Sequence, residues 1–447
     1  MKKISIVLGM LLAAAVVMAA VQDPAGFDKY WHQWRGPQMN GVSTNGNPPL
    51  EWSETKNIKW KVAIPGRGHS TPIVWENKIF ILTAVPLEPE ATPTAKEGEQ
   101  GGRRGMPSRK TDIKHRFNVL CIDRGDGHVI WQKTVKEEVP QEATHELGSW
   151  ASHSPVTDGK HVFAYFGSRG LFCLDAADGS LKWERDFGQM SKRMAFGEGS
   201  SPALYGDRIF ILWDHEGDSF LYALDKKTGQ DVWKAERDEG TSWATPIVVE
   251  GDGKLQVITS ATKLIRSYDF ETGELIWQCG GMTANAIPTP MVADGILYVM
   301  SGFRGNALLA IRLAGAKGDI TGTDAIAWSY DGKETPYTPC GLLFGDKLYF
   351  LRSNNGILSC FNIKTGEPYY TGQRMEGFGN LYTSPVGARD RVYILSQKGT
   401  MFVVAHGPEF KILAQNTLED SFHASPAIVG NQMFLRGFEN LYCIEEH

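Results

Sequence analysis

Three histidines stand near the start of a recurring apolar stretch, a position from which imidazole side chains could hold a metal or a ligand. His69 and His423 lie three residues before a proline that introduces such a stretch, and His153 lies two residues before another. On an extended chain, side chains two and three residues before the same point lie on opposite faces, so His153 is out of register with His69 and His423. The sequence shows no short-spaced pair of metal ligands beside them. A metal site therefore remains open, and hydrogen-bonding histidines are the interpretation that we favour.

Other polar and aromatic residues occupy the same positions ahead of the apolar stretches, and they differ from one repeat to the next. Residues that only maintain a repeat should recur, whereas residues that bind a ligand can vary. Aromatic rings at these positions could stack on a planar ligand or a sugar, although packing along a central axis explains them equally well. We predict a ligand-binding surface formed by His69, Trp150, His153, Glu198, Trp243, Asn285, Tyr337, Tyr382 and His423.

A short acidic stretch, WDHEGDSF, places three carboxylates close together at Asp214, Glu216 and Asp218. Clustered carboxylates are suitable calcium ligands, but the spacing is not that of an EF-hand loop. A solvated turn is the interpretation that we favour, with calcium as the alternative. Arg169 and Arg304 occupy equivalent turns in other repeats. They could bind an anion, and again a solvated turn is the alternative.

Eight Ser-Pro or Thr-Pro dipeptides mark the repeat that positions these residues. Apart from a first interval of 83 residues, the prolines are 41–49 residues apart. Several intervals predict four short strands, with Thr-Gly in the last turn and Trp in the last strand. Four strands in about 40–45 residues are typical of a β-propeller blade. The sequence therefore predicts an all-β, eight-bladed propeller of four-stranded antiparallel blades, which begin at Pro72, Pro155, Pro202, Pro246, Pro290, Pro339, Pro385 and Pro426.

The last repeat ends before its fourth strand. Its third strand is expected near residues 440–444, and the sequence stops at His447. Residues 57–63 precede the first repeat, have the character of a strand and carry Trp60 where a fourth strand would have its tryptophan. Pairing the two segments would close the ring and remove its open sheet edges. We therefore predict that residues 57–63 complete the blade that begins at Ser425.

Two further positions recur with small side chains. Each proline follows a serine or threonine, whose hydroxyl could bond to the backbone at the start of the strand or could line a channel. A second position lies in the third strand, where a small buried side chain is expected. Ala223 occupies it in one repeat and cysteines occupy it in four, which favours free thiols over disulfides: Cys121, Cys173, Cys360 and Cys443.

The pattern Ala-x-Asp-x-x-Thr-Gly-x-x-x-Trp, complete at residues 223–233, resembles the repeat of the pyrroloquinoline-quinone (PQQ) propellers. Asp175/Gly179/Trp183 and Asp269/Thr272/Gly273/Trp277 match it in part. The chain is most similar to secreted PQQ-like repeat proteins grouped with the assembly factor BamB. The resemblance implies that the Trp of one blade docks on the next and that Thr-Gly forms the turn. It does not imply that quinone binds.

These observations predict an exported, non-catalytic binding or scaffold protein. It would act through the face on which each first strand begins, here called the funnel face, and bind a protein partner, a small ligand or a glycan there. The first alternative is a PQQ-dependent oxidoreductase, with Trp243 as a stacking platform and carboxylates holding calcium. The second is a carbohydrate-binding module. The adjacent Cys pair of PQQ dehydrogenases is missing from this sequence, and their calcium site matches no motif in it.

The remaining segments predict how the chain is divided and where it acts. Residues 1–20 resemble a signal peptide, followed by a lead-in at 21–56 on the side of a propeller at 57–447. A Pro/Gly- and charge-rich insertion at 86–112 is expected to be flexible. We expect a periplasmic or secreted monomer with no membrane span and no lipid anchor. The net charge of −5 argues against nucleic acid as a partner.

Overall fold

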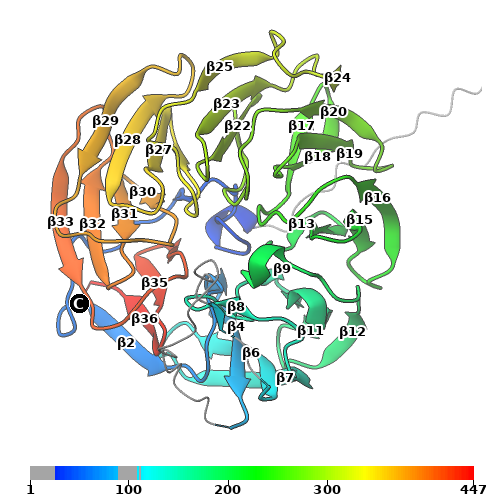
Figure 1. Ribbon diagram of the computed structural model, residues 1–447. Helices are drawn as coiled ribbons and strands as arrows, with labels where there is room; N and C mark the ends of the chain where they lie inside the picture. The colour runs from blue at the N-terminus through cyan, green and yellow to red at the C-terminus, as the bar shows by residue number, and fades with distance from the viewer. Residues whose placement is uncertain (1–25, 89–107, 110–111, 447) are drawn as a thin grey trace, which may run out of the picture.

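The strands of the protein form eight blades of four antiparallel strands each around a central axis, as the sequence predicts (Figure 1). The computed structural model describes residues 26–88, 108–109 and 112–446. The first strand of each blade is short and lies nearest the axis, and the fourth lies on the outside. In the described part of the chain, no helix has the length and apolar character needed to cross a membrane.

The first four blades follow the chain without a crossover. Blade one contains β3 (Ile73–Trp75), β4 (Lys78–Pro86), β6 (His115–Asp123) and β7 (Val129–Glu138). Blade two contains β9 (Val156–Thr157), β10 (His161–Tyr165), β11 (Leu171–Asp175) and β12 (Leu181–Arg185). Blade three contains β13 (Ala203–Tyr205), β14 (Arg208–Trp213), β15 (Ser219–Asp225) and β16 (Asp231–Arg237). Blade four contains β17 (Ile247–Gly251), β18 (Lys254–Thr259), β19 (Ile265–Asp269) and β20 (Leu275–Cys279).

The next blades continue in the same order. Blade five contains β21 (Met291–Ala293), β22 (Ile296–Ser301), β23 (Ala307–Arg312) and β25 (Ile326–Tyr330). Blade six contains β26 (Leu342–Phe344), β27 (Lys347–Leu351), β28 (Ile357–Asn362) and β29 (Pro368–Arg374). Blade seven contains β30 (Val386–Ala388), β31 (Arg391–Leu395), β32 (Thr400–Ala405) and β33 (Ile412–Thr417). The last three strands are β34 (Ala427–Val429), β35 (Gln432–Arg436) and β36 (Asn440–Ile444).

An N-terminal strand completes blade eight and closes the ring. Strand β2 (Ile58–Ala63) pairs antiparallel with β36, with Ile58 opposite Ile444 and Ala63 opposite Asn440. The predicted closure is therefore confirmed. Blades eight and one also share one hydrophobic core, which continues past the point where the two ends of the chain meet.

Short elements outside the blades connect neighbouring parts of the ring. Strand β24 (Gly318–Asp319), from an insertion in blade five, extends the sheet of blade four by pairing parallel to β20. Strand β1 (Val42–Ser43) pairs parallel to β30, and β5 (Ser108–Arg109) pairs with β8 (Thr144–His145). Most of the insertion at 86–112, like residues 1–20, lies outside the described residues. The 3-10 helices are η1 (Phe27–Lys29), η2 (Gly167–Arg169) and η3 (Arg193–Ala195).

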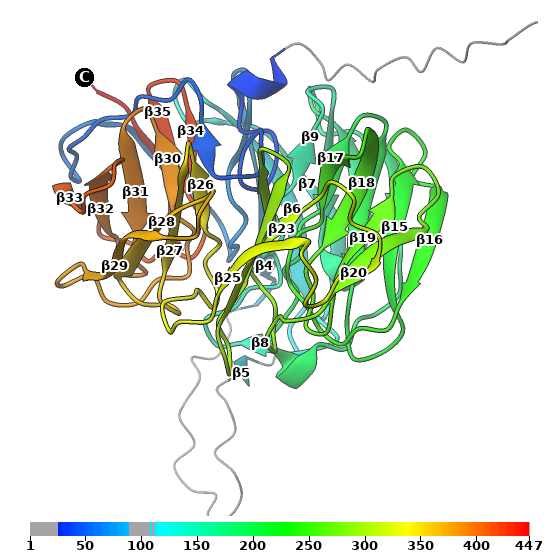
Figure 2. The same ribbon diagram turned by 90° about the horizontal axis from the view of Figure 1, so that it is seen from above.

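The lead-in segment lies across one end of the axis before it reaches the side of the propeller. The carbonyl of Trp31 accepts the N–H of Val74 in blade one, and the carbonyl of Asn40 accepts the N–H of Leu343 in blade six. Only its later part lies where we expected it, with Trp52 bonded to Asn416 on the outer strand of blade seven. Figure 2 shows η1 and β8 at opposite ends of the molecule.

Tryptophans of the fourth strands join neighbouring blades. Five of them donate their indole N–H, over 2.9–3.3 Å, to a carbonyl in the last turn of the next blade. The glycine of that turn has φ between 70° and 82°, and a Cβ on it would lie 2.6–2.8 Å from the indole. Glycine is therefore required both by the backbone and by the contact. The pairs are Trp60–Gly127, Trp131–Gly179, Trp183–Gly229, Trp233–Gly273 and Trp328–Gly366.

The small residue of the third strand lies directly opposite the aromatic residue of the fourth. Cys173 faces Trp183, Ala223 faces Trp233, and Cys443 faces Trp60 across the ring closure. A bulky side chain here would push the indole away from the next blade. All six cysteines are buried free thiols, including the four at this position, for which we favoured that state.

Candidate functional site

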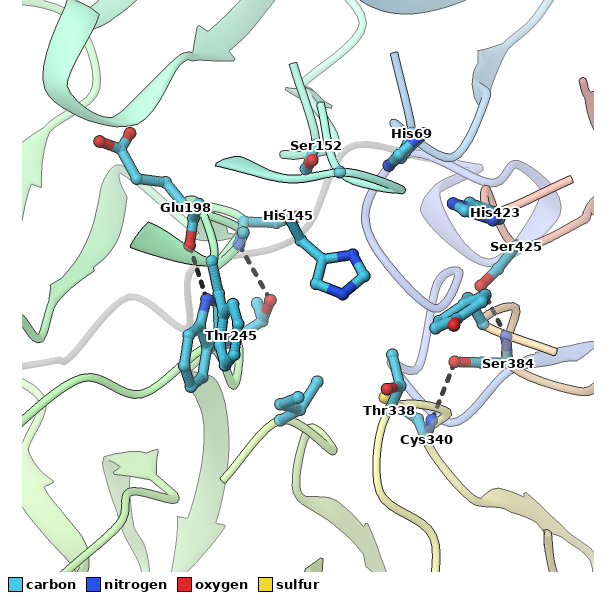
Figure 3. Close-up of a pocket in the computed structure, with 18 of the residues that line it drawn as sticks. His69, His145, Ser152, Glu198, Thr245, Thr338, Cys340, Ser384, His423 and Ser425 are labelled. Atoms are coloured by element: carbon cyan, nitrogen blue, oxygen red, sulfur yellow. Dashed lines mark hydrogen bonds between the residues drawn. The ribbon is translucent and has the colours of Figure 1, made fainter. Parts of the chain in front are cut away.

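A cavity of about 380 Å³ lies at the centre of the funnel face, and we call it the axial pocket (Figure 3). Its wall comes from the residues just before the first strand of each of the eight blades. Trp34 of the lead-in also lines it and donates its indole N–H to the hydroxyl of Thr289 at 3.1 Å. Because the lead-in crosses the axis at the opposite end, Trp34 forms a floor, and the pocket opens toward β8.

A ring of hydrogen bonds between blades surrounds this pocket. Seven backbone N–H groups of this ring, from Thr71 round to Ser384, donate to the side chain at the same position in the next blade, over 2.9–3.3 Å. The hydroxyl of Thr71 accepts no such bond in the described structure, so the ring is open between blades eight and one. Both interpretations of the hydroxyls thus have support, because Ser154, Ser201, Thr245, Thr289, Ser384 and Ser425 each accept a backbone N–H and also line the pocket. The ring runs through Thr71, Ser154, Ser201, Thr245, Thr289, Cys340, Ser384 and Ser425.

Blade six departs from the predicted register of this ring. We expected Thr338 to take the position, because it precedes Pro339 as the other hydroxyl residues precede their prolines. The structure places Cys340 there, and its sulfur accepts the N–H of Thr289 at 3.2 Å. Thr338 instead bonds through its N–H to the side chain of Asn354. The Thr-Pro dipeptide of this blade is therefore two residues out of register.

Aromatic rings cover much of the remaining wall. The indole N–H of Trp243 donates to the carbonyl of Gly197 at 2.8 Å, which fixes the ring at the edge of the cavity. Tyr337 and Phe303 stack with their centroids 4.8 Å apart, and both line the pocket. Tyr382 packs against His423 at 4.6 Å. The site thus offers flat apolar surfaces, which suit a planar or ring-shaped ligand.

Two of the three predicted histidines meet at the pocket. The rings of His69 and His423 are 4.8 Å apart, edge to face, and both line the cavity. His423 bonds through Nδ1 to the carbonyl of Leu147 at 3.0 Å, so Nδ1 carries the proton. Burial, with a smaller effect of Arg67, lowers the pKa of His423 to about 4. The imidazole is therefore neutral at pH 7, and its Nε2 is a buried acceptor without a hydrogen-bond partner in the described structure.

His153 lies behind the wall, as its different register suggested. It is 1% exposed, does not line the cavity and packs edge to face on Tyr165 with centroids 4.7 Å apart. His145 of β8, which was not among the predicted residues, lies in the cavity instead and reaches toward its centre in Figure 3. No repeat pattern covers β8, so the sequence held no signal for it.

Glu198 lines the pocket but directs its carboxylate away from it (Figure 3). The carboxylate accepts the N–H and the hydroxyl of Ser168, and an Arg169 guanidinium nitrogen lies 3.3 Å away. Burial alone would raise the pKa of Glu198, but Arg169 and then His153 outweigh it and lower the pKa below its usual value. Arg169 is thus engaged with Glu198 and is not a free anion-binding group.

The other predicted residues lie outside the pocket lining. Trp150 donates to the carbonyl of Glu142, and Asn285 supports the wall through the Tyr337 hydroxyl at 3.4 Å. Arg304 is exposed on a turn of blade five. Trp34, which does line the pocket, was missed because the lead-in belongs to no repeat.

The acidic stretch does not gather into a metal site. Asp214 is fully buried in a two-oxygen ion pair with Arg237, at 2.7 and 3.1 Å. Glu216 accepts the N–H and hydroxyl of Thr241, and Asp218 is exposed. The only described group with metal-ligand geometry is an outer turn, where carboxylates already accept backbone N–H groups: Asp123, Asp126 and His128.

The blade order, the docked tryptophans and the pocket on the axis together define an eight-bladed β-propeller of the PQQ-like repeat class. The chain belongs to the family of the outer membrane protein assembly factor BamB, whose profile matches residues 115–242 and 217–446.

Solved structures with the same fold include a BamB protein and a quinohemoprotein alcohol dehydrogenase. BamB from Moraxella catarrhalis is 15% identical, with a TM-score of 0.53 over 81% of this chain and 100% of that one. The quinohemoprotein alcohol dehydrogenase from Comamonas testosteroni is 9% identical, with a TM-score of 0.60 over 95% of this chain and 81% of that one. At these identities the likeness concerns the fold alone.

One curated relative is a tetrathionate hydrolase from Acidithiobacillus ferrooxidans. It is 25% identical over 289 residues, which cover 58% of this chain and 54% of the relative. The chain thus spans about half the length of the curated relative it matches.

Acidification should destabilise the fold through its buried histidines. Burial lowers the pKa of His32, His153 and His423 to about 4 from 6.5. Between these values the unfolded chain binds more protons, so stability should fall as the pH drops from 6.5 to 4. The loss should reach about 3 kcal/mol for each histidine. Urea unfolding of the wild type and His153→Phe at pH 7 and pH 4.5 checks this. Equal losses of stability in both proteins would contradict the role of His153.

Proposed function

We propose that the protein is an exported, non-catalytic binding protein whose ligand enters the axial pocket. The observation that carries this proposal is a cavity with a floor at one end, aromatic walls and a buried, unpaired acceptor at His423 Nε2. Such a combination of flat apolar surface and a few polar groups is typical of ligand sites of this size. A ligand that donates a hydrogen bond to Nε2 would remove the cost of leaving that atom unpaired.

The ligand could be a free small molecule, a sugar or a side chain presented by a protein partner. The size of the cavity favours a compact ligand. Trp243 and the Phe303–Tyr337 stack provide separate flat surfaces, which favour a ring-shaped group. Export rests on the signal-like residues 1–20. N-terminal sequencing of the protein recovered from the periplasm or the medium should find a chain that begins near residue 21.

The alternative of a PQQ-dependent oxidoreductase keeps one observation in its favour, the fixed indole of Trp243 at the cavity edge. The residues do not fit its calcium ion. Glu198 is the one carboxylate among the described lining residues, and its oxygens face Ser168 and Arg169. Calcium prefers six to eight oxygen ligands, which this wall does not supply.

Thermal denaturation with a set of candidate ligands tests the proposal. The set contains mono- and disaccharides, aromatic amino-acid amides, PQQ with calcium, and tetrathionate. A ligand selective for the folded state should raise the melting temperature, and Trp243→Ala should lose that rise while Trp150→Ala, outside the lining, keeps it. Dye reduction with PQQ and calcium, or turnover of tetrathionate, would contradict a non-catalytic role.

A further inference from the structure

One residue of the pocket wall, Leu147, binds two histidines through its own peptide groups. Its carbonyl accepts a hydrogen bond from Nδ1 of His423 at 3.0 Å, and its N–H donates to Nδ1 of His145 at 3.2 Å. A carbonyl oxygen can only accept, so Nδ1 of His423 carries the proton. A backbone N–H can only donate, so Nδ1 of His145 does not. The two rings are therefore held in opposite tautomers.

Opposite tautomers leave opposite groups at the Nε2 atoms of the two rings. His423 offers a bare nitrogen and His145 offers an N–H, and no hydrogen bond within the described residues occupies either group. Both side chains line the axial pocket, and His145 reaches toward its centre (Figure 3). Burial lowers the pKa of both imidazoles, so both are neutral at pH 7. The pocket thus contains one fixed acceptor and one fixed donor on two uncharged rings.

The rest of the wall offers little that would attract an ion. The described lining residues include no Lys, Arg or Asp, and Glu198 directs its carboxylate away from the cavity. An ionic ligand would lose its hydration here without gaining a counter-ion, which is costly. Flat apolar surfaces are present instead, at Trp243 and at the Phe303–Tyr337 stack. The site therefore suits an uncharged molecule that has a ring and can both donate and accept hydrogen bonds.

We propose that the ligand of the axial pocket is an uncharged pyranose sugar, either free or at the end of a glycan. A sugar hydroxyl both donates and accepts, so it can accept the Nε2–H of His145 and donate its O–H to Nε2 of His423. The apolar C–H face of the same ring can pack on the indole of Trp243. This inference rests on the proposed function, because it names the class of molecule that the same pocket binds.

The tautomers can be tested without any ligand. In wild-type protein labelled with nitrogen-15 in its histidines, NMR spectra at pH 7 should show a proton on Nε2 of His145 and on Nδ1 of His423. Spectra of His145→Phe and His423→Phe assign the two signals. The same tautomer in both rings, or a proton on both nitrogens of either ring, would overturn the donor–acceptor pair.

The ligand class is tested with the methyl glycosides of glucose, galactose, mannose and N-acetylglucosamine, by saturation-transfer NMR and calorimetry, and with a glycan array. We expect at least one of these sugars to bind the wild type at millimolar concentration, alone or on the array. Binding of the free glycoside identifies a single sugar as the ligand, and binding on the array alone identifies the end of a glycan. No binding in either form would overturn the proposal.

Monodeoxy forms of the sugar that binds locate the hydroxyl between the histidines. Removal of that hydroxyl should weaken binding about tenfold or more, because both histidine groups lose their partner. His423→Phe keeps a flat ring without the acceptor and should cause a similar loss. The deoxy sugar should then lose little more on this variant. His128→Phe, on an exposed outer turn, is the matched control and should bind as the wild type does. If no single hydroxyl matters on the wild type, the proposal is wrong, whether or not His423→Phe folds.

Failure of this inference can be told apart from failure of the proposed function. Suppose that no sugar binds, but another compound from the thermal-denaturation set binds and needs Trp243. The sugar is then wrong, and the axial pocket is still a ligand site. If neither a sugar nor any other compound of that set binds, both proposals are contradicted.

Discussion

Trp233→Ala should lower the free energy of unfolding by about 3–5 kcal/mol, a typical cost of removing a large buried aromatic side chain. Trp233 is 8% exposed, packs on Gly273 of the next blade and donates to the carbonyl of Phe270 at 2.9 Å. Its loss would leave a cavity between blades three and four, while the Phe270 carbonyl would keep its hydrogen bond from Arg208. Urea unfolding followed by circular dichroism measures the change.

The matched control is Val232→Ala, on the same strand. Val232 is 43% exposed, so its truncation should change stability little. Trp243→Ala is a second control, because it removes an indole of the same size from the pocket wall and not from a blade interface. A loss for Trp233→Ala no greater than that for Val232→Ala would show that the docked tryptophans do not hold the blades together.

Asp214→Asn should also destabilise the protein strongly, by about 3–5 kcal/mol, because it leaves a buried charge without its partner. Asp214 and Arg237 are fully buried, and Arg237 also donates to Thr259 and Tyr268. The guanidinium cannot lose its proton or reach water, so the neutral amide leaves it uncompensated. Urea unfolding at neutral pH measures the effect.

Asp238→Asn provides the comparison, since its ion pair with Lys263 is exposed and should contribute little. Calcium removal distinguishes the two roles considered for Asp214. If Asp214 holds Arg237 and no metal, a chelator should leave the wild-type midpoint unchanged. A midpoint lowered by the chelator and restored by calcium would show that a calcium ion stabilises the fold.

The sequence was most informative where a structural task recurs in every blade. The tryptophan, the turn glycine and the small residue opposite the tryptophan recur because each blade interface requires the same contact. The closing strand could be found because Trp60 carries that same signal away from its repeat. Because the same contact is required at each blade interface, the residues that make it recur and can be recognised in a single sequence.

The candidate site was predicted only in part, because its geometry depends on contacts between distant segments. Trp34 reaches the axis from a lead-in that follows no repeat. Cys340 was missed because a Thr-Pro dipeptide two residues earlier imitates the register of the other blades. Glu198 was placed correctly in the wall, but its orientation follows from Arg169 in another blade. Whether these residues bind a ligand stays a prediction.

The pairing of β2 with β36 also governs when the molecule can be completed during its synthesis. Ala63 leaves the ribosome early, but its partner Asn440 is made only near the end of the chain. At roughly 5–20 residues per second this interval is on the order of half a minute, during which β2 has an unpaired edge. Translation therefore sets the earliest time of ring closure. In a nascent chain stalled before Asn440, the edges of β2 and β35 that pair with β36 would be open to mispairing.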